Sequence, residues 1–166
     1  ISAVVGQRDL MMVFDEIFFS GTFGGETLSL AACKATIAEM RETDTISHLW
    51  SVGKRLVDEL SSLIRQHGLN DAVKVLGLPV RSVLAFPHPD ETETLLRRSY
   101  FMQECVKRGL LYFCSHIPCA AHGETELAFT SQVLREVVPL FAAACKANDF
   151  ATRMEGQRVE TIFRKA

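Results

Sequence analysis

Apolar residues recur at helical spacing over three long stretches after residue 45. The first, residues 46–68, carries an apolar face made of Leu49, Trp50, Val52, Leu56, Val57, Leu60, Leu63 and Ile64. Side chains return to one face of a helix every three to four residues, so this spacing predicts a core-facing helix. The same pattern predicts a helix over residues 91–108, with Asp90 as its N-cap and Glu93 completing a capping box. A last helix is predicted to begin at Glu124, with Pro139 expected to kink or restart it.

Short β-branched and apolar runs predict the strands. Residues 73–76 and 80–86 predict two strands or one interrupted strand, because a glycine and a proline separate them. Residues 110–113 predict a third strand. Residues 1–5 are a further β-branched run and predict a short buried strand.

The chain divides into two parts at a polar break around residues 41–45. Residues 1–42 contain the first predicted strand, a short helix over Arg8–Phe14, a glycine-rich loop and a helix from Thr27, but no sheet partners of their own. Residues 43–166 alternate helix and strand, which predicts a compact α+β unit with a small sheet covered by helices. The chain starts without Met and in a strand pattern, so we interpret it as the cut end of a longer protein whose remainder packs against residues 1–42.

Composition excludes some classes of function. The 166 residues are 48% hydrophobic and 23% charged with a net charge of −2, as in an ordinary globular protein. Near-neutral charge without a basic stripe argues against nucleic-acid binding. No stretch of eighteen uninterrupted apolar residues is present, so no membrane span is expected. Five cysteines, mostly in apolar stretches, favour a reducing cytoplasm over a disulfide framework.

The glycine-rich loop is the first candidate site. Ser20-Gly21-Thr22-Phe23-Gly24-Gly25-Glu26 leads directly into the predicted helix at Thr27. Glycines let backbone N–H groups converge, the threonine hydroxyl adds a donor, and a helix N-terminus adds partial positive charge. This combination suits a phosphate group, although a plain loop before a core helix has the same appearance.

Two further segments give the loop a context. The opening Ile1-Ser2-Ala3-Val4-Val5-Gly6 precedes it, and Gly109–His122 follows the pattern Gly-hydrophobic-Leu-aromatic-x-x-x-His-x-x-x-x-Ala-His. With the loop, these segments make the chain resemble class III (fold-type I) pyridoxal-phosphate aminotransferases, close to the glutamate-1-semialdehyde aminomutase branch. The family motif continues Gly-Thr-aromatic-Gly-Gly with Asn-Pro, where this chain has Glu26-Thr27.

The resemblance implies a fold and a site. It implies an α/β protein in which residues 1–42 are the tail of a large cofactor-binding domain and residues 43–166 form a small C-terminal α+β domain with an antiparallel sheet. Thr22, with Gly21 beside it, would contact the phosphate of pyridoxal 5'-phosphate held by the neighbouring subunit of a homodimer, and Phe23 would line the cofactor pocket. The alternative for Phe23 is simple packing in the dimer interface.

The second candidate site lies in the segment that ends at His122. By the resemblance, His116 lies near the mouth of the active site, where it would contact the small-molecule substrate. His122 is expected to cap a helix or to make a structural hydrogen bond. Arg81 is compared with the small-domain arginine that binds substrate carboxylates in related enzymes, the alternative being a strand arginine that faces solvent.

A metal site is the competing interpretation of this segment. Cys114, His116, Cys119 and His122 are all zinc-type ligands. They fall within nine residues of one loop, which is tighter than usual zinc frameworks, so we predict no metal site.

The resemblance assigns a reaction to the parent enzyme and not to this segment. The parent would transfer an amino group through Schiff-base intermediates, which requires a cofactor-bound lysine. None of the lysines here has the family's strand-end context, so we expect the segment alone to be inactive and the lysine to precede Ile1. The alternative function is a non-catalytic α+β interaction module, and apolar surface exposed on residues 1–40 would count against it.

Overall fold

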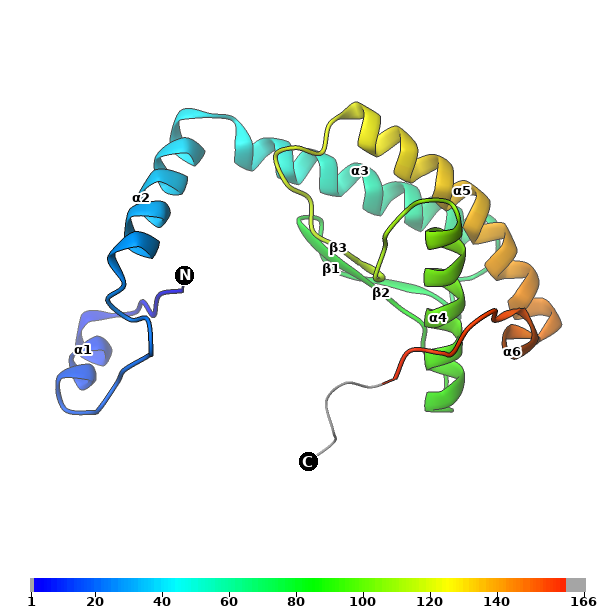
Figure 1. Cartoon of the computed structure of the whole chain (residues 1–166), viewed down its shortest axis with the longest axis horizontal. Helices are drawn as coiled ribbons and strands as arrows, with labels where there is room; N and C mark the ends of the chain where they lie inside the picture. The colour runs from blue at the N-terminus through cyan, green and yellow to red at the C-terminus, as the bar shows by residue number, and fades with distance from the viewer. Residues whose placement is uncertain (1, 161–166) are drawn as a thin grey trace. The chain divides into compact units, whose positions relative to one another are not determined.

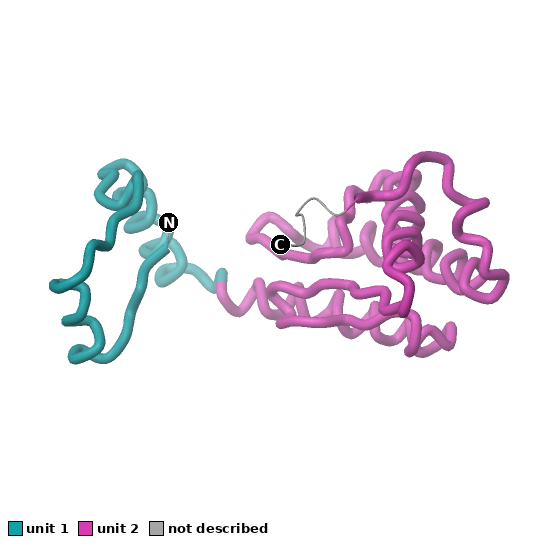
Figure 2. Tube along the Cα trace, turned by 90° about the horizontal axis from the view of Figure 1, so that it is seen from below, with its two compact units in different colours: residues 1–45 teal, residues 46–166 magenta. Residues whose placement is uncertain are grey.

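The computed structural model describes residues 2–160 and divides into two compact units, Ile1–Thr45 and Ile46–Ala166 (Figures 1 and 2). The sequence predicts the division into two parts between residues 42 and 43. Each unit is described by itself below. Their assignment to the large and small domains of a longer enzyme stays a prediction.

The first unit consists of short helices and loops. It contains α1 (Arg8–Met11), the 3-10 helix η1 (Met12–Asp15) and α2 (Thr27–Glu42). None of its described residues is buried, and large apolar side chains such as Phe18 (95% exposed) and Val5 (86%) lie at its surface. This unit therefore has no core of its own among the residues described.

The predicted strand over residues 1–5 is not formed. Residues 2–5 are irregular and exposed, while Ile1 lies outside the described residues. A strand is stabilised by backbone hydrogen bonds to a neighbouring strand, and the described part of this unit contains none. The β-branched pattern favours a strand, but the described residues of this unit include no strand for it to pair with.

The second unit is a two-layer arrangement of a small sheet and helices. Its elements after α3 (Thr45–Gln66) are β1 (Lys74–Leu78), β2 (Arg81–Ala85), α4 (Glu91–Lys107), β3 (Ser115–His116), α5 (Glu124–Ala147) and α6 (Phe150–Arg153). The sheet is antiparallel in the order β1-β2-β3. Leu84 and Phe86 face the helices and are buried, whereas the other face exposes Leu76, Leu78 and Val83. The predicted fold class, mixed α/β with a small antiparallel sheet covered by helices, is confirmed.

The core of this unit is an aromatic cluster centred on α5. Phe141 is fully buried, and its ring centroid lies 5.3 Å from Phe86, 5.8 Å from Phe101 and 5.2 Å from Phe150. Rings at these separations in tilted or edge-to-face arrangements attract each other beyond the area they bury. The cluster therefore joins α4, α5, α6 and the chain directly after β2 around one side chain.

Among residues 2–160, α5 is the one helix with the length and composition of a membrane span. By length and composition it is long and apolar enough to cross a bilayer. Its apolar residues Val133, Leu134, Val137, Val138, Phe141 and Ala144 are buried in the core of this unit. The helix continues through Pro139 as one element, so of the two expected effects, a kink or a restart, the restart does not occur.

Several element ends differ from the sequence prediction. Asp90 caps α4, accepting a hydrogen bond from the Thr92 N–H at 2.8 Å, but Glu93 completes no capping box because the Asp90 N–H donates to His88 Nδ1. The third strand is Ser115–His116 and not residues 110–113.

One residue expected in the core lies at the surface instead. Trp50 on α3 is 44% exposed.

A glycine in α3 sets how closely the β1–β2 hairpin approaches that helix. A Cβ built on Gly53 would lie 2.2 Å from the Pro79 carbonyl oxygen, well inside van der Waals contact. Pro79 and Val80 form the two-residue turn between Leu78 and Arg81. Gly53 therefore lets the hairpin turn rest on the helix backbone.

We expect Gly53→Ala to destabilise the chain by about 1–3 kcal/mol, because the added methyl group overpacks this contact. At an exposed helical position the same change stabilises by about 1 kcal/mol. The free energy of unfolding from denaturant titration checks this, with Ser51→Ala on the exposed side of α3 as control. A Gly53→Ala protein as stable as the parent would contradict the close contact.

Candidate functional site

The glycine-rich loop of the first unit is a compact, solvent-exposed turn. The Gly24 N–H donates to the Gly21 carbonyl at 3.0 Å, and the Glu26 N–H donates to the Phe23 carbonyl at 3.2 Å. Thr22 is exposed, its hydroxyl makes no hydrogen bond within residues 2–160, and Phe23 is 78% exposed. The predicted cofactor contacts of Gly21, Thr22 and Phe23 stay predictions, and the loop leaves the threonine hydroxyl available for a phosphate.

The N-terminus of α2 is already occupied by a carboxylate of the chain itself. Glu26 is its N-cap and accepts hydrogen bonds from the Leu28 N–H at 2.7 Å and the Ser29 N–H at 2.6 Å. Hydrogen bonds from the Ser29 side chain and backbone, and from Leu28, lower the pKa of Glu26. Glu26 therefore competes with a phosphate for these two N–H groups, and the contribution of the helix terminus to a phosphate site stays a prediction. The position of Glu26 directly before the helix was the available signal.

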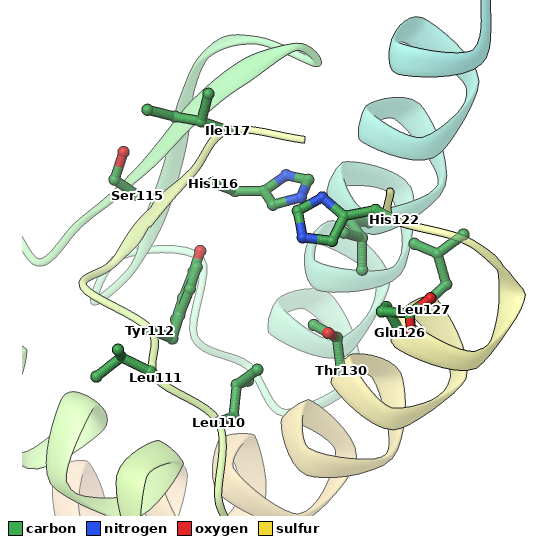
Figure 3. Close-up of a pocket in the computed structure, with 11 residues that line it drawn as sticks. Leu110, Leu111, Tyr112, Ser115, His116, Ile117, His122, Glu126, Leu127 and Thr130 are labelled. Carbon is green, nitrogen blue, oxygen red and sulfur yellow. The ribbon is translucent and has the colours of Figure 1, made fainter. Parts of the chain in front are cut away.

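The second unit contains a pocket of about 190 Å³ between α3, the start of α5 and the chain around β3 (Figure 3). Its walls are Leu56, Leu110, Leu111, Tyr112, Ser115, His116, Ile117, His122, Glu126, Leu127 and Thr130. His116 and His122 meet at one end, while the ring of Tyr112 stands along another side. The structure thus places His116, a predicted site residue, in the wall of a pocket.

His122 is held by the loop that precedes α5. Its Nδ1 accepts a hydrogen bond from the Cys119 N–H at 2.9 Å, so in the neutral ring Nε2 carries the proton. His48 Nε2 on α3 lies 3.0 Å from the His122 carbonyl oxygen, which accepts that bond. The expected structural hydrogen bond of His122 is confirmed, whereas α5 is capped by Gly123 and Glu126.

His116 presents a buried nitrogen without a partner. Its Nδ1 is shielded from solvent and makes no hydrogen bond within the described chain. Burial, with a smaller contribution from the neighbouring His122, lowers the pKa of His116. The ring is therefore neutral at neutral pH and can donate or accept one hydrogen bond at each nitrogen according to its tautomer.

Tyr112 is the polar residue of the pocket that the sequence analysis missed. The side chain is 9% exposed, and its hydroxyl has no hydrogen-bond partner among the described residues. Burial, with smaller contributions from Cys114 and Cys105, raises the pKa of Tyr112, so the hydroxyl keeps its proton. Its sequence signal was only the aromatic position of the Gly109–His122 pattern.

Arg81 lies away from this pocket. It pairs with Leu78 across the hairpin and is exposed to solvent, and its side chain makes no ion pair or hydrogen bond to any residue from 2 to 160. It does not line the pocket. The interpretation of Arg81 as a solvent-facing strand residue therefore fits the structure.

The four zinc-type side chains do not converge. Cys114 is buried, and burial raises its pKa to about 12, whereas Cys119 is exposed on the loop. His122 uses its Nδ1 for the Cys119 backbone. Over residues 2–160 no group of three or more histidine, cysteine or acidic side chains is placed to hold a metal ion.

The fold has a counterpart among solved structures. It is similar to the Sphingopyxis sp. MTA144 FumI protein, whose structure was determined in its PLP (pyridoxal phosphate) internal aldimine form. The TM-score is 0.67 at 23% identity, and the alignment covers 89% of this chain and 34% of the FumI chain. No protein-family model matches the sequence, and no curated protein sequence matches it. The chain thus has the fold of part of a PLP-dependent enzyme and spans about a third of the FumI chain.

We expect the His116 ring to titrate below 6.5, the ordinary pKa of histidine, because burial disfavours its charged form. The unfolded chain then binds more protons than the folded chain just below that pH. The stability contributed by neutral His116 is therefore fully present above pH 6.5 and is lost as the pH falls from there through the lower folded-state pKa.

Two measurements check this expectation. An NMR titration of the His116 ring protons gives the midpoint directly. Denaturant unfolding between about pH 7.5 and about pH 5 should show a shallower loss of stability in His116→Gln than in the parent chain. A ring midpoint at or above 6.5 would exclude the buried, neutral state.

Proposed function

We propose that this chain is the C-terminal portion of a class III PLP-dependent aminotransferase or aminomutase, similar to the glutamate-1-semialdehyde aminomutase branch. The observation that carries the proposal is the match to FumI, which extends over 89% of this chain. The motif resemblance at Gly21–Gly25 and Gly109–His122 agrees with it. The amino donor and acceptor are small molecules.

The first unit would hold the cofactor phosphate of a neighbouring subunit. Thr22 supplies an unused hydroxyl, and the turn around Gly21 and Phe23 is open, with no atom within 4 Å of a Cβ built at Gly21. Hydrogen bonds to a phosphate dianion are charge-assisted and strong. Because Glu26 occupies the terminus of α2, Thr22 and the loop would bind the phosphate without that helix.

Exposed apolar surface on the first unit supports a homodimeric parent. Phe18, Phe19, Phe23 and Val5 are each more than half exposed, and no described residue of this unit is buried. A finished interaction module would cover such surface, so the observation counts against the non-catalytic alternative. Under the proposal, the rest of the enzyme and its second subunit cover it.

The second unit would contribute the substrate-side wall. His116 would contact substrate from the pocket, neutral and with one buried nitrogen unsatisfied. PLP, when bound, supplies the electron sink for amino-group transfer. We assign the cofactor-bound lysine to the upstream part of the enzyme, since Lys34, Lys54, Lys74, Lys107 and Lys146 are all solvent-exposed and Lys165 lies outside the described residues. The free cysteines agree with a cytoplasmic location.

The test uses this chain expressed with the upstream sequence with which it occurs. We expect Thr22→Ala to weaken PLP binding about 10- to 100-fold, the loss of one hydrogen bond to a charged group. Thr36→Ala is the matched control, because Thr36 is exposed on α2 and its hydroxyl bonds only to the Ala32 carbonyl. Affinity is read from cofactor absorbance during equilibrium dialysis.

Two outcomes would contradict the proposal. Full PLP affinity in Thr22→Ala would remove the assigned phosphate contact. Failure of the extended protein to form a borohydride-reducible PLP adduct on a lysine would remove the catalytic assignment and favour the interaction module.

A further inference from the structure

The charge of the pocket beside His116 restricts what it can hold. No lysine or arginine lines it, and its single formally charged side chain is the carboxylate of Glu126. Arg81, the residue compared with a carboxylate-binding arginine, is on the exposed face of the hairpin and does not contribute. An anion entering this pocket would lose water and gain no opposite charge, which is strongly unfavourable.

Apart from the Glu126 carboxylate, which accepts a hydrogen bond from the Gly123 N–H, the pocket offers hydrogen-bond donors. Nδ1 of His122 accepts a hydrogen bond from the Cys119 N–H. The Nε2–H of the neutral His122 ring is therefore the donor that remains. The Tyr112 hydroxyl is more than nine-tenths buried and unpartnered, and Nδ1 of His116 is unpartnered as well. Buried polar groups without partners are unfavourable, so a ligand that satisfies one of them gains affinity. A carbonyl or hydroxyl oxygen fits these donors without bringing a charge.

The remaining wall is apolar and sets the size. Leu56, Leu110, Leu111, Ile117 and Leu127 provide it. A volume of about 190 Å³ has room for about six water-sized groups at ~30 Å³ each. This suits a short branched alkyl group with one polar end.

We infer that this pocket binds an uncharged alkyl portion of the substrate bearing a carbonyl or hydroxyl group, and that it rejects a carboxylate. The inference rests on the proposed function for the identity of the ligand as a substrate. Binding of such a group is a property of the second unit and can be measured without cofactor. Tyr112 and His122 are then specificity-determining residues that orient the polar end.

The test compares two probes of the same shape, 2-methylpropanamide and 2-methylpropanoate. Each is titrated into the ¹⁵N-labelled 166-residue chain at neutral pH, and amide shifts of His116, Ile117 and Leu127 are followed. We expect the amide to bind at least about ten-fold more tightly than the carboxylate, since the pocket offers hydrogen-bond donors and no cation. Equal or tighter binding of the carboxylate, absence of binding by the amide, or shifts confined to other residues would overturn the inference.

A pair of tyrosine variants assigns the effect to the pocket. Tyr112→Phe should weaken amide binding several-fold while leaving the dispersion of the spectrum intact. Tyr100→Phe is the matched control, because Tyr100 is also buried (4% exposed) but packs against Phe150 outside the pocket. Equal affinity in Tyr112→Phe and the parent chain would exclude the tyrosine hydroxyl from recognition.

The two proposals fail separately. If the amide preference is absent while PLP binding still depends on Thr22, only the inference about the pocket is overturned. Amide preference without PLP binding in the extended protein overturns the proposed function and leaves the pocket as a binding site of another kind.

Discussion

The packing of Phe141 is the interaction on which the rest of the second unit depends. This one ring contacts Phe86 directly after β2 and aromatic side chains from α4 and α6, so it fixes the end of β2, helix α4 and the C-terminal segment with respect to α5. The start of α5 also forms one wall of the pocket through Glu126, Leu127 and Thr130. The aromatic core therefore determines where the pocket walls lie. Gly53 makes a second contribution, because it lets the β1–β2 hairpin approach α3 closely. This contact holds β2 in place, and with it the neighbouring strand β3. The pocket is a consequence of core packing and needs no separate scaffold.

Sequence periodicity was sufficient where an element carries its own stabilising contacts. The helices α3, α4 and α5 each present an apolar face, and the structure has them within a few residues of the predicted ranges. Sequence periodicity failed where an element depends on contacts with residues far along the chain. Residues 2–5 have a strand sequence without a neighbouring strand, and β3 lies after the apolar run at residues 110–113 because the chain pairs with β2 only from Cys114 onward. Pro139 leaves α5 continuous, because the buried residues on both sides of it pack in one core.

The candidate site was predictable to a similar extent. His116 could be singled out because an ionisable ring in a motif segment is a visible chemical signal, and Arg81 could be weighed against its alternative. Tyr112 could not, because an aromatic residue in an apolar run is normally core, and only the three-dimensional structure reveals that its hydroxyl lacks a partner beside a pocket. Glu26 shows the opposite case, in which a visible acidic residue at an N-cap accepts hydrogen bonds from two N–H groups of a helix terminus that otherwise looks ready for an anion.

The absence of buried residues in the described part of the first unit has a consequence for how this chain unfolds. Denaturant sensitivity scales with the surface that becomes exposed on unfolding. Since the side chains of the first unit are already accessible, its residues contribute little to that change, and nearly all of the cooperative transition belongs to the second unit. The denaturant m-value of the chain should therefore be that of a domain distinctly shorter than 166 residues. Association that covers the first unit should appear as an increase in m, a thermodynamic signature of assembly that requires no knowledge of the reaction.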